Sequence, residues 1–341
     1  MKHLFSKLDN DRSILIGLVL GFGVLYFSTL ATSIQGHDAA EFATIYAEGG
    51  YAHPPGYPLY SLWLHFFSWL PTTNAAAGAS AATACLGIAA VAVLYLAMRA
   101  WGAVRFGALF GALAFGLATD IWLYHTQPEV FALNHLVAGL ILWFASPDPP
   151  ARGLGRVAAL GLIAGMGISN HHTIVLMAPI GLFGVYHGVA EADSPLPIVL
   201  SAGVGGLFLG LLPYAYLPLV EAWNIGWHWG EPTDIRGLLH LFLREDYGTF
   251  SMTTGETPTP ASIQLGFLAR AIPLDLLVVP LLLVPLALLD LYMTDSETDN
   301  GPLPRLRSTC LLASLVLTGP VFATLLTREP TETEIGRASC R

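Results

Sequence analysis

Long apolar runs dominate this sequence and restrict the folds open to it. Runs of roughly 17 to 25 residues recur along the chain, the length a helix needs to cross a hydrocarbon core about 30 Å thick. Only 11% of the 341 residues are charged, whereas a soluble domain carries about 25%. An ordinary soluble enzyme is therefore excluded, and the sequence predicts an all-α polytopic membrane protein. The predicted spans are residues 13–34, 75–98, 106–122, 130–146, 155–169, 172–189, 196–219, 263–290 and 308–327.

Charge excludes two kinds of partner and predicts an orientation. The net charge of −9 and the lack of basic blocks argue against nucleic acid and against a polybasic lipid anchor. Basic residues in short loops mark the cytoplasmic side of a membrane. With the N-terminus inside, the following residues are cytoplasmic: Lys2, Lys7, Arg12, Arg99, Arg105, Arg152, Arg156, Arg305 and Arg307. The segments 35–74, 123–129, 169–172 and 220–262 then face the periplasm or lumen.

The two ends of the chain need separate interpretation. Residues 13–34 resemble a signal peptide with a small-residue site near Ala31, but the apolar core is long, so we favour an uncleaved first helix. Residues 335–341 (IGRASCR) read back as a translated sequencing adapter, with a genuine polar tail as the alternative. We therefore treat residues 1–334 as one transmembrane domain and expect the natural protein to continue beyond it.

The first outer segment carries two carboxylates that suit acid–base chemistry. Asp38 and Glu41 are spaced to share one face of a helix. Carboxylates at a membrane boundary are costly to desolvate and tend to have a raised pKa, which suits a general base. The alternative is that Asp38 only caps the helix that follows it.

Prolines and aromatic residues follow these carboxylates. The segment 53–58 (HPPGYP) cannot be helical throughout, and we expect it to cross a site as extended chain. Residues 57–70 are rich in aromatic side chains but too short to span a membrane, which favours a helix lying in the interface. An anchoring belt would explain the aromatic residues but not the prolines.

Three further places on the same side carry polar groups. Glu129 stands at the outer end of the fourth span, and His171 and His172 interrupt two apolar runs. Broken helices whose ends line a polar cavity often bind anions, whereas adjacent histidines make a poor metal pair. Arg244 ends an amphipathic segment, where its guanidinium could grip a phosphate; a salt bridge to Glu245 or Asp246 is the alternative. Cysteines supply neither a disulfide framework nor a metal site.

These motifs together resemble one family. Six motifs are similar in kind and order to those of the protein O-mannosyltransferase-like family of the GT-C glycosyltransferase superfamily. They are GxDxxEF at 36–42, AHPPGYPL at 52–59, EVFxLN at 129–134, NHxT at 170–173, WGxP at 229–232 and RxxYG at 244–248. The resemblance covers about residues 13–265. Its most specific part is the HPPGYP run after an acidic loop.

The resemblance implies a GT-C-like bundle with interfacial helices in the first outer loop. It also implies an inverting transfer of a sugar from a polyprenyl phosphate to a hydroxyl of a protein or glycan, and the expected sugar is mannose. It places Asp38 at the catalytic carboxylate position, with Glu41 beside it. No cofactor is required, and no metal ligands are assigned, although Asp38 and Glu41 leave room for a divalent ion. We assign donor phosphate binding to His53, His171, His172, Arg244 and Tyr247, and acceptor binding or site lining to His37, Tyr57, Glu129 and Trp229.

A membrane transporter or a non-catalytic scaffold is the competing interpretation. A transporter would distribute polar groups through the bilayer midplane and often contain an internal repeat. The predicted spans are nearly free of charge, with Asp275 the main exception, and no repeat is evident. The polar residues instead gather on one face, which favours an enzyme working at the membrane surface.

Overall fold

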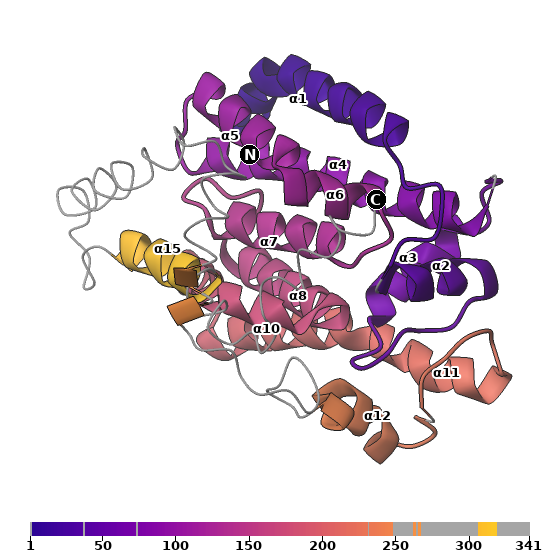
Figure 1. The fold of residues 1–341 in the computed structure, drawn as a ribbon. Coiled ribbons are helices and arrows are strands. Elements are labelled where there is room, and N and C mark those ends of the chain that lie inside the picture. The colour runs from indigo at the N-terminus through magenta and orange to yellow at the C-terminus, as the bar shows by residue number, and fades with distance from the viewer. Residues whose placement is uncertain are drawn as a thin grey trace.

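The structure is a computed structural model that describes residues 2–36, 38–72, 74–230, 232–247, 262–263, 265–266 and 306–318. Within these ranges the regular secondary structure is helical and no sheet forms (Figure 1). The elements are α1 (Lys2–Ser28), α2 (Asp38–Glu48), α3 (Pro58–Phe67), α4 (Ala75–Ala100), α5 (Arg105–Leu117), α6 (Thr119–Thr126), α7 (Phe131–Ala145), α8 (Gly153–Asn170), η1 (His172–Met177), α9 (Ala178–Ala190), α10 (Leu196–Leu211), η2 (Leu212–Ala215), α11 (Tyr216–Trp223), α12 (Ile235–Leu243), η3 (Glu245–Tyr247) and α15 (Leu306–Val316).

Helices occupy each of the first seven predicted spans. Four helical segments in the described residues are long and apolar enough to cross a membrane, namely Asp11–Ser28, Ala75–Ala100, His172–Ala190 and Leu196–Trp223. The bent pair α5–α6 adds a fifth when it is counted as one span. The span predicted at 263–290 and the tail at 335–341 lie outside the residues that the structure describes, apart from short pieces near 262–266, and only part of 308–327 lies inside them. The total of nine spans stays a prediction.

The third span is bent rather than straight, which the sequence did not indicate. Helices α5 and α6 meet at 65° around Ala118. A break of this kind frees a backbone carbonyl, which must find a partner inside an apolar bundle. The Tyr26 hydroxyl of α1 donates to the Gly116 carbonyl oxygen at 2.8 Å and satisfies it. A side chain from a neighbouring helix therefore supports the bend.

Helices α8 and α10 approach each other closely because both are rich in glycine. A Cβ added at Gly161 would lie 2.0 Å from the Gly203 carbonyl oxygen, and one at Gly210 would lie 2.3 Å from that of Leu162. Small residues at such a contact let two backbones pack directly, which is how helices associate where lipid removes the hydrophobic drive.

Basic side chains lie at one end of the bundle. Asp11 of α1 accepts hydrogen bonds from Arg99 and Arg105, each at 2.8 Å, where α4 ends and α5 begins. The buried Arg156 of α8 donates to the carbonyl oxygen of Ala145 at 2.7 Å, at the end of α7. The indole of Trp101 at the end of α4 donates to Leu142 of α7 at 2.8 Å, so these chain turns are neighbours.

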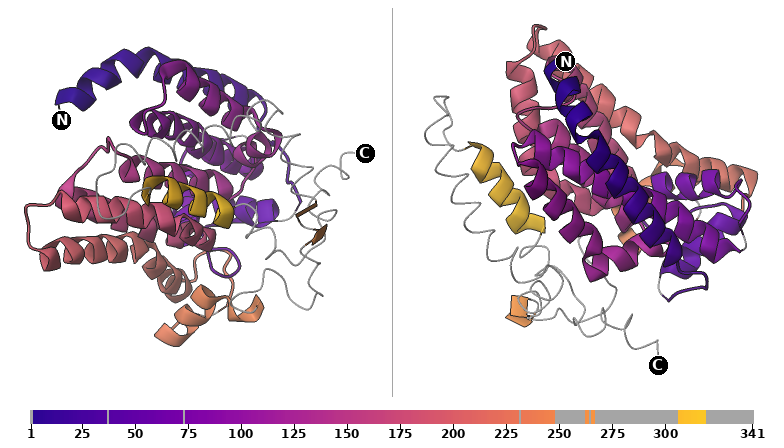
Figure 2. Two further views of the ribbon diagram at one scale, coloured as in Figure 1. Left: turned by 90° about the vertical axis from the view of Figure 1, so that its left-hand side faces the viewer. Right: turned by 90° about the horizontal axis from the view of Figure 1, so that it is seen from above.

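Helices α2, α3, α11 and α12 gather at the other end (Figure 1). In the right-hand view of Figure 2, the violet α2 and α3 again lie together with the salmon α11, away from the N-terminus. The first outer segment therefore contains two short helices, as the resemblance implied. Their depth relative to a bilayer stays a prediction.

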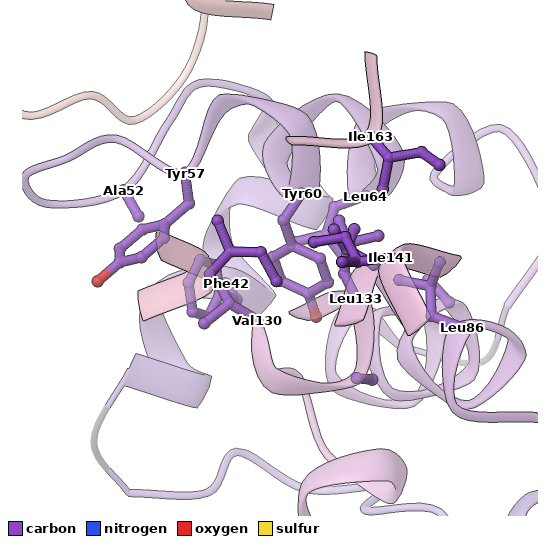
Figure 3. Close-up of a cluster of buried hydrophobic side chains, with 14 of the residues drawn as sticks. Phe42, Ala52, Tyr57, Tyr60, Leu64, Leu86, Val130, Leu133, Ile141 and Ile163 are labelled. Atoms are coloured by element: carbon purple, nitrogen blue, oxygen red, sulfur yellow. The ribbon is translucent and has the colours of Figure 1, made fainter. Parts of the chain in front are cut away.

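A buried apolar cluster joins this end to the bundle. Phe42 of α2 packs its ring edge against Tyr60 of α3 at a centroid distance of 5.0 Å, and both belong to one core with Val130 and Leu133 of the α6–α7 region. In Figure 3, Tyr60 lies among these side chains, whereas Tyr57 lies at the edge with its hydroxyl directed away from them. The cluster thus fixes α2 and α3 on the bundle and leaves Tyr57 available to a polar site.

Candidate active site

Glu41 and His53 form the centre of the polar site. Glu41 lies in the first turn of α2, and His53 lies in the proline-containing segment before α3. His53 Nδ1 donates to Glu41 Oε2 at 2.6 Å, and the backbone N–H of His53 donates to Oε1 at 3.0 Å. Both side chains are mostly buried, with 15% and 16% of their surface exposed. The carboxylate therefore fixes the position and the tautomer of the imidazole.

The other face of His53 is directed at Asp38 and Tyr57. Its Nε2 lies 3.9 Å from Asp38 Oδ2 and 3.3 Å from the Tyr57 hydroxyl. Burial alone would lower the pKa of His53, but the hydrogen bond to Glu41 and the charges of both carboxylates outweigh it and raise the pKa. The His53 ring thus lies between two carboxylates, of which Asp38 is the accessible one with 51% of its side chain exposed.

Asp38 is the first residue of α2, so the sequence prediction that it shares a helix face with Glu41 is confirmed. The N-terminal end of a helix favours a negative charge. Elsewhere in the chain, capping side chains accept a hydrogen bond from a backbone N–H two or three residues on, as Asn74 and Asp234 do. The carboxylate of Asp38 instead faces His53, which favours the chemical interpretation over the capping one.

His171 forms an aromatic wall of the site. Its ring stacks on Tyr57 at a centroid distance of 5.8 Å and an interplanar angle of 22°. Nδ1 accepts from the Thr173 backbone N–H at 3.3 Å and lies 2.6 Å from the Thr173 hydroxyl, which in turn accepts from Asn134. Burial lowers the pKa of His171 to about 3, so the ring is neutral and its proton lies on Nε2. The break between α8 and η1 therefore presents a neutral donor.

Glu129 lies deeper, in the break between α6 and α7. The residue is only 5% exposed. Burial raises its pKa to about 8, and the negative charge of Asp38 adds to the effect. Glu129 is therefore a protonated acid at neutral pH, beside an accessible carboxylate. Two carboxyl groups in different environments, one neutral and one available to ionise, are typical of sites that divide proton transfer between them.

The segment after α12 brings Arg244 to the same end. The charge of Arg244 acts on His53, His171 and His172, lowering the pKa of His171 after the effects of burial and His172. His172 Nε2 lies 3.2 Å from the Tyr214 hydroxyl, and its ring packs on Phe242 of α12. The carboxylates of Glu245 and Asp246 each lie 2.9 Å from a ring nitrogen of His240. Arg244 therefore contributes a positive charge to the side of the site that faces α12.

Three of the predicted site residues are not among the side chains described above. His37 lies outside the described residues, and so does the side chain of Tyr247. Trp229 lies in the α11–α12 loop and is 40% exposed, and its place in the site stays a prediction. Trp227 of the same loop, which is 45% exposed, donates to Glu41 Oε1 at 3.4 Å, a contact for which the sequence carried no signal.

Sequence reasoning also missed a buried histidine pair beneath the site. His125 of α6 and His135 of α7 are joined at 3.0 Å, and His125 Nδ1 lies 3.3 Å from the Tyr26 hydroxyl. Because that hydroxyl donates to Gly116, it accepts from His125, so the polar groups satisfy one another inside the bundle.

The described residues contain no group of three or more His, Cys, Asp or Glu side chains that could hold a metal ion. At the Asp38 and Glu41 position the donor set does not fit a cation. Both oxygens of Glu41 accept N–H donors, and the His53 ring lies between the two carboxylates.

The fold and site define a membrane protein whose apolar helices support a cluster of acids and histidines at one end. Residues 38–192 match the family model described as the protein O-mannosyl-transferase TMEM260 N-terminal domain. This match supports the resemblance to an O-mannosyltransferase-like family that the sequence motifs indicated. All four residues of the central cluster, Asp38, Glu41, His53 and Tyr57, fall within the matched range, as do Glu129 and His171.

Two curated relatives cover a longer stretch. The chain is 30% identical over 260 residues to the protein O-mannosyl-transferase TMEM260 of Mus musculus, a match that covers 73% of this chain and 36% of the relative. It is 28% identical over 258 residues to the protein of the same name from Dictyostelium discoideum, covering 70% of this chain and 31% of the relative. The chain spans about a third of the length of these relatives. No solved structure matches it.

Proposed function

We propose that this chain is the membrane domain of a glycosyltransferase that moves a mannosyl group from a polyprenyl phosphate to a hydroxyl of a protein. The observation that carries the proposal is the cluster of Asp38, His53 and Glu41 at one end of an apolar bundle, with Arg244 close enough to act on its charges. The names of the two relatives favour mannose and a protein acceptor.

The reaction needs one base at the acceptor. Asp38 accepts the proton of the acceptor hydroxyl while that oxygen forms a bond to the anomeric carbon. The bond from the anomeric carbon to the phosphate oxygen breaks, and the electron pair leaves with the polyprenyl phosphate. Attack opposite the leaving group inverts the anomeric centre. The His53 ring, which Glu41 holds in place, lies beside the Asp38 carboxylate and positions it for this step.

The donor phosphate needs donors and positive charge. Arg244 supplies a guanidinium that suits a phosphate bidentately, and His171 supplies a neutral Nε2–H. The His172 ring packs on Phe242 of α12, the helix that ends at Arg244. A departing phosphate is stabilised by such preorganised donors and needs no proton. We assign Tyr247, the next residue of the RxxYG motif, to the same subsite.

The lipid nature of the donor explains why the active site is built at the end of a bundle of membrane helices. Helix α12 exposes Ile235, Leu239 and Leu243 on one stripe, at the spacing of successive helical turns. That stripe suits the interface of a bilayer and would hold Arg244 at the level of a lipid phosphate. We therefore propose a GT-C-like domain over residues 1–334, with the N-terminus cytoplasmic and the site facing the periplasm or lumen.

The test of this function is donor use by the full-length protein in liposomes. We expect release of radiolabelled mannose from polyprenyl-phosphate-mannose onto a Ser/Thr-rich acceptor peptide, and at least about 10-fold less transfer from GDP-mannose, because that donor has no tail to lie in the bilayer. NMR of the product would give the anomeric configuration. Transfer from the nucleotide donor at an equal rate would contradict the proposal.

We also expect the transfer rate to be unchanged by metal removal. A cation at Asp38 and Glu41 would have to displace the N–H donors that both oxygens of Glu41 accept and the His53 ring that lies between the two carboxylates. The measurement compares initial rates before and after EDTA treatment and with added Mg²⁺ or Mn²⁺. A loss of activity in EDTA that Mn²⁺ restores would show that the site takes a divalent ion.

A further inference from the structure

The α11–α12 loop is fastened to the first outer segment across a sequence distance of more than 170 residues. The backbone N–H of Trp227 donates to the Gly49 carbonyl oxygen at 3.2 Å, and the N–H of Tyr51 donates to the Trp227 carbonyl oxygen at 3.0 Å. This isolated parallel bridge pairs Gly50 with Trp227. We call the paired segments 49–51 and 226–227 the clasp.

The clasp requires glycine on both sides. Gly50 has φ +102°, and a Cβ there would lie 1.6 Å from the Trp227 carbonyl oxygen. Gly226 has φ +54°, and its Cβ would lie 2.2 Å from the Glu48 carbonyl oxygen. A side chain at either position would force the two backbones apart. The contact is therefore a defined close approach, and it sets the position of the Trp227 side chain.

The indole of Trp227 uses this position to reach Glu41. Its Nε1–H donates to Glu41 Oε1 at 3.4 Å, the same oxygen that accepts from the His53 backbone at 3.0 Å. The other oxygen, Oε2, takes the His53 ring. Trp227 thus approaches Glu41 from the loop, and His53 approaches it from the first outer segment.

We propose that Trp227 is a positioning residue for the transfer reaction: by donating to Glu41 it holds the carboxylate that orients His53 beside Asp38. The inference rests on the proposed function. Trp227 touches no reacting atom. It acts through Glu41. Through this contact the α11–α12 loop becomes a component of the site, although the loop lies beyond the residues matched by the family model.

The experiment is a double-mutant cycle in the full-length protein, with Trp227→Phe, Glu41→Gln and the double variant. Trp227→Phe keeps an aromatic side chain and the backbone bridge, and it removes the N–H donor together with the pyrrole part of the indole. Trp223→Phe is the matched control, because Trp223 is an exposed tryptophan at the end of α11. The kcat and KM for polyprenyl-phosphate-mannose and the apparent Tm are measured for each variant.

We expect Trp227→Phe to lower kcat by about 3- to 10-fold, the effect of one weak hydrogen bond to a charged group, with KM for the donor unchanged. In the Glu41→Gln background the same substitution should have a smaller effect, because the amide oxygen is a weaker acceptor than the carboxylate and the His53 ring has lost the carboxylate that orients it. The Trp223→Phe control should match the wild type. A Trp227→Phe variant with wild-type kcat, or with an effect that multiplies that of Glu41→Gln, would overturn the proposal.

The apparent Tm separates this inference from the proposed function. If the wild type turns over no donor, the function fails, but the two substitutions should still couple in Tm: Trp227→Phe lowers Tm less in Glu41→Gln than in the wild type, because the amide oxygen is a weaker acceptor than the carboxylate. Additive shifts in Tm would show that Trp227 and Glu41 are independent, and they would reject the inference whether or not the protein is active.

Discussion

Replacing Asp38 with asparagine should reduce mannosyl transfer by 100-fold or more, which is roughly the cost of a missing general base. The amide keeps the shape of the side chain but cannot accept a proton from the acceptor hydroxyl. It also leaves His53 with one carboxylate neighbour instead of two. The loss should fall on kcat, while KM for the donor stays close to that of the wild type, because Asp38 acts on the acceptor.

The measurement is single-turnover release of radiolabelled mannose by the full-length protein in liposomes. Glu48→Gln is the matched control, since Glu48 is an exposed acid at the opposite end of the same helix α2 and loses the same charge. The apparent Tm of Asp38→Asn should equal that of the wild type, because half of the Asp38 side chain is exposed. Equal transfer rates for Asp38→Asn and wild type would exclude Asp38 as the base and make Glu41 the next candidate.

The parts of the site that are close in sequence could be predicted from the sequence. Asp38, Glu41 and His53 stand within 16 residues of one another. Helical spacing predicted that Asp38 and Glu41 share one face, and the HPPGYP motif of the family resemblance indicated His53 as a further site residue. The helices in the first seven predicted spans were predictable from the apolar runs. Apolar runs of membrane-crossing length admit few structures, because every backbone polar group in lipid must be satisfied internally.

The long-range contacts could not be predicted in this way. The donation from Trp227 to Glu41 joins residues 186 positions apart, and hydrophobic periodicity carries no information about which loop docks on which. The bend at Ala118 depends on the Tyr26 hydroxyl of another helix. The pairing of His125 with His135 depends on how α6 returns against α7. Tertiary packing decides each of these, so the sequence could nominate Trp229 in the right loop and still miss the residue that makes the contact.

The burial of Glu129 is another tertiary property, and it leads to the second large effect that we expect. The pKa of this carboxyl is raised from 4.5 to about 8 by burial and by the charge of Asp38. The folded state therefore binds a proton that the unfolded chain releases above pH 4.5. The contribution of this group to stability is fully present below pH 4.5 and is lost progressively as the pH rises toward 8. The apparent Tm of the wild type should fall across that window.

Glu129→Gln should remove this pH dependence. The amide is neutral at every pH and still offers an oxygen to the Val130 backbone N–H, which bonds the carboxyl in the wild type. At pH 7 the variant should be more stable than the wild type by roughly 3 kcal/mol, from about 1.4 kcal/mol for each pH unit between the unfolded pKa and the working pH. Below pH 4.5 the two proteins should have the same Tm.

Activity then tells whether the proton on Glu129 is used in the reaction or only tolerated there. If Glu129 serves as a fixed neutral donor, Glu129→Gln should keep transfer within about 10-fold of the wild type, because the amide also donates. If Glu129 takes part in proton transfer, the loss should approach that of Asp38→Asn, since an amide cannot release a proton. A Tm for Glu129→Gln that falls with pH as steeply as that of the wild type would show that this carboxyl is ionised in the folded protein, and it would remove the neutral acid from the site.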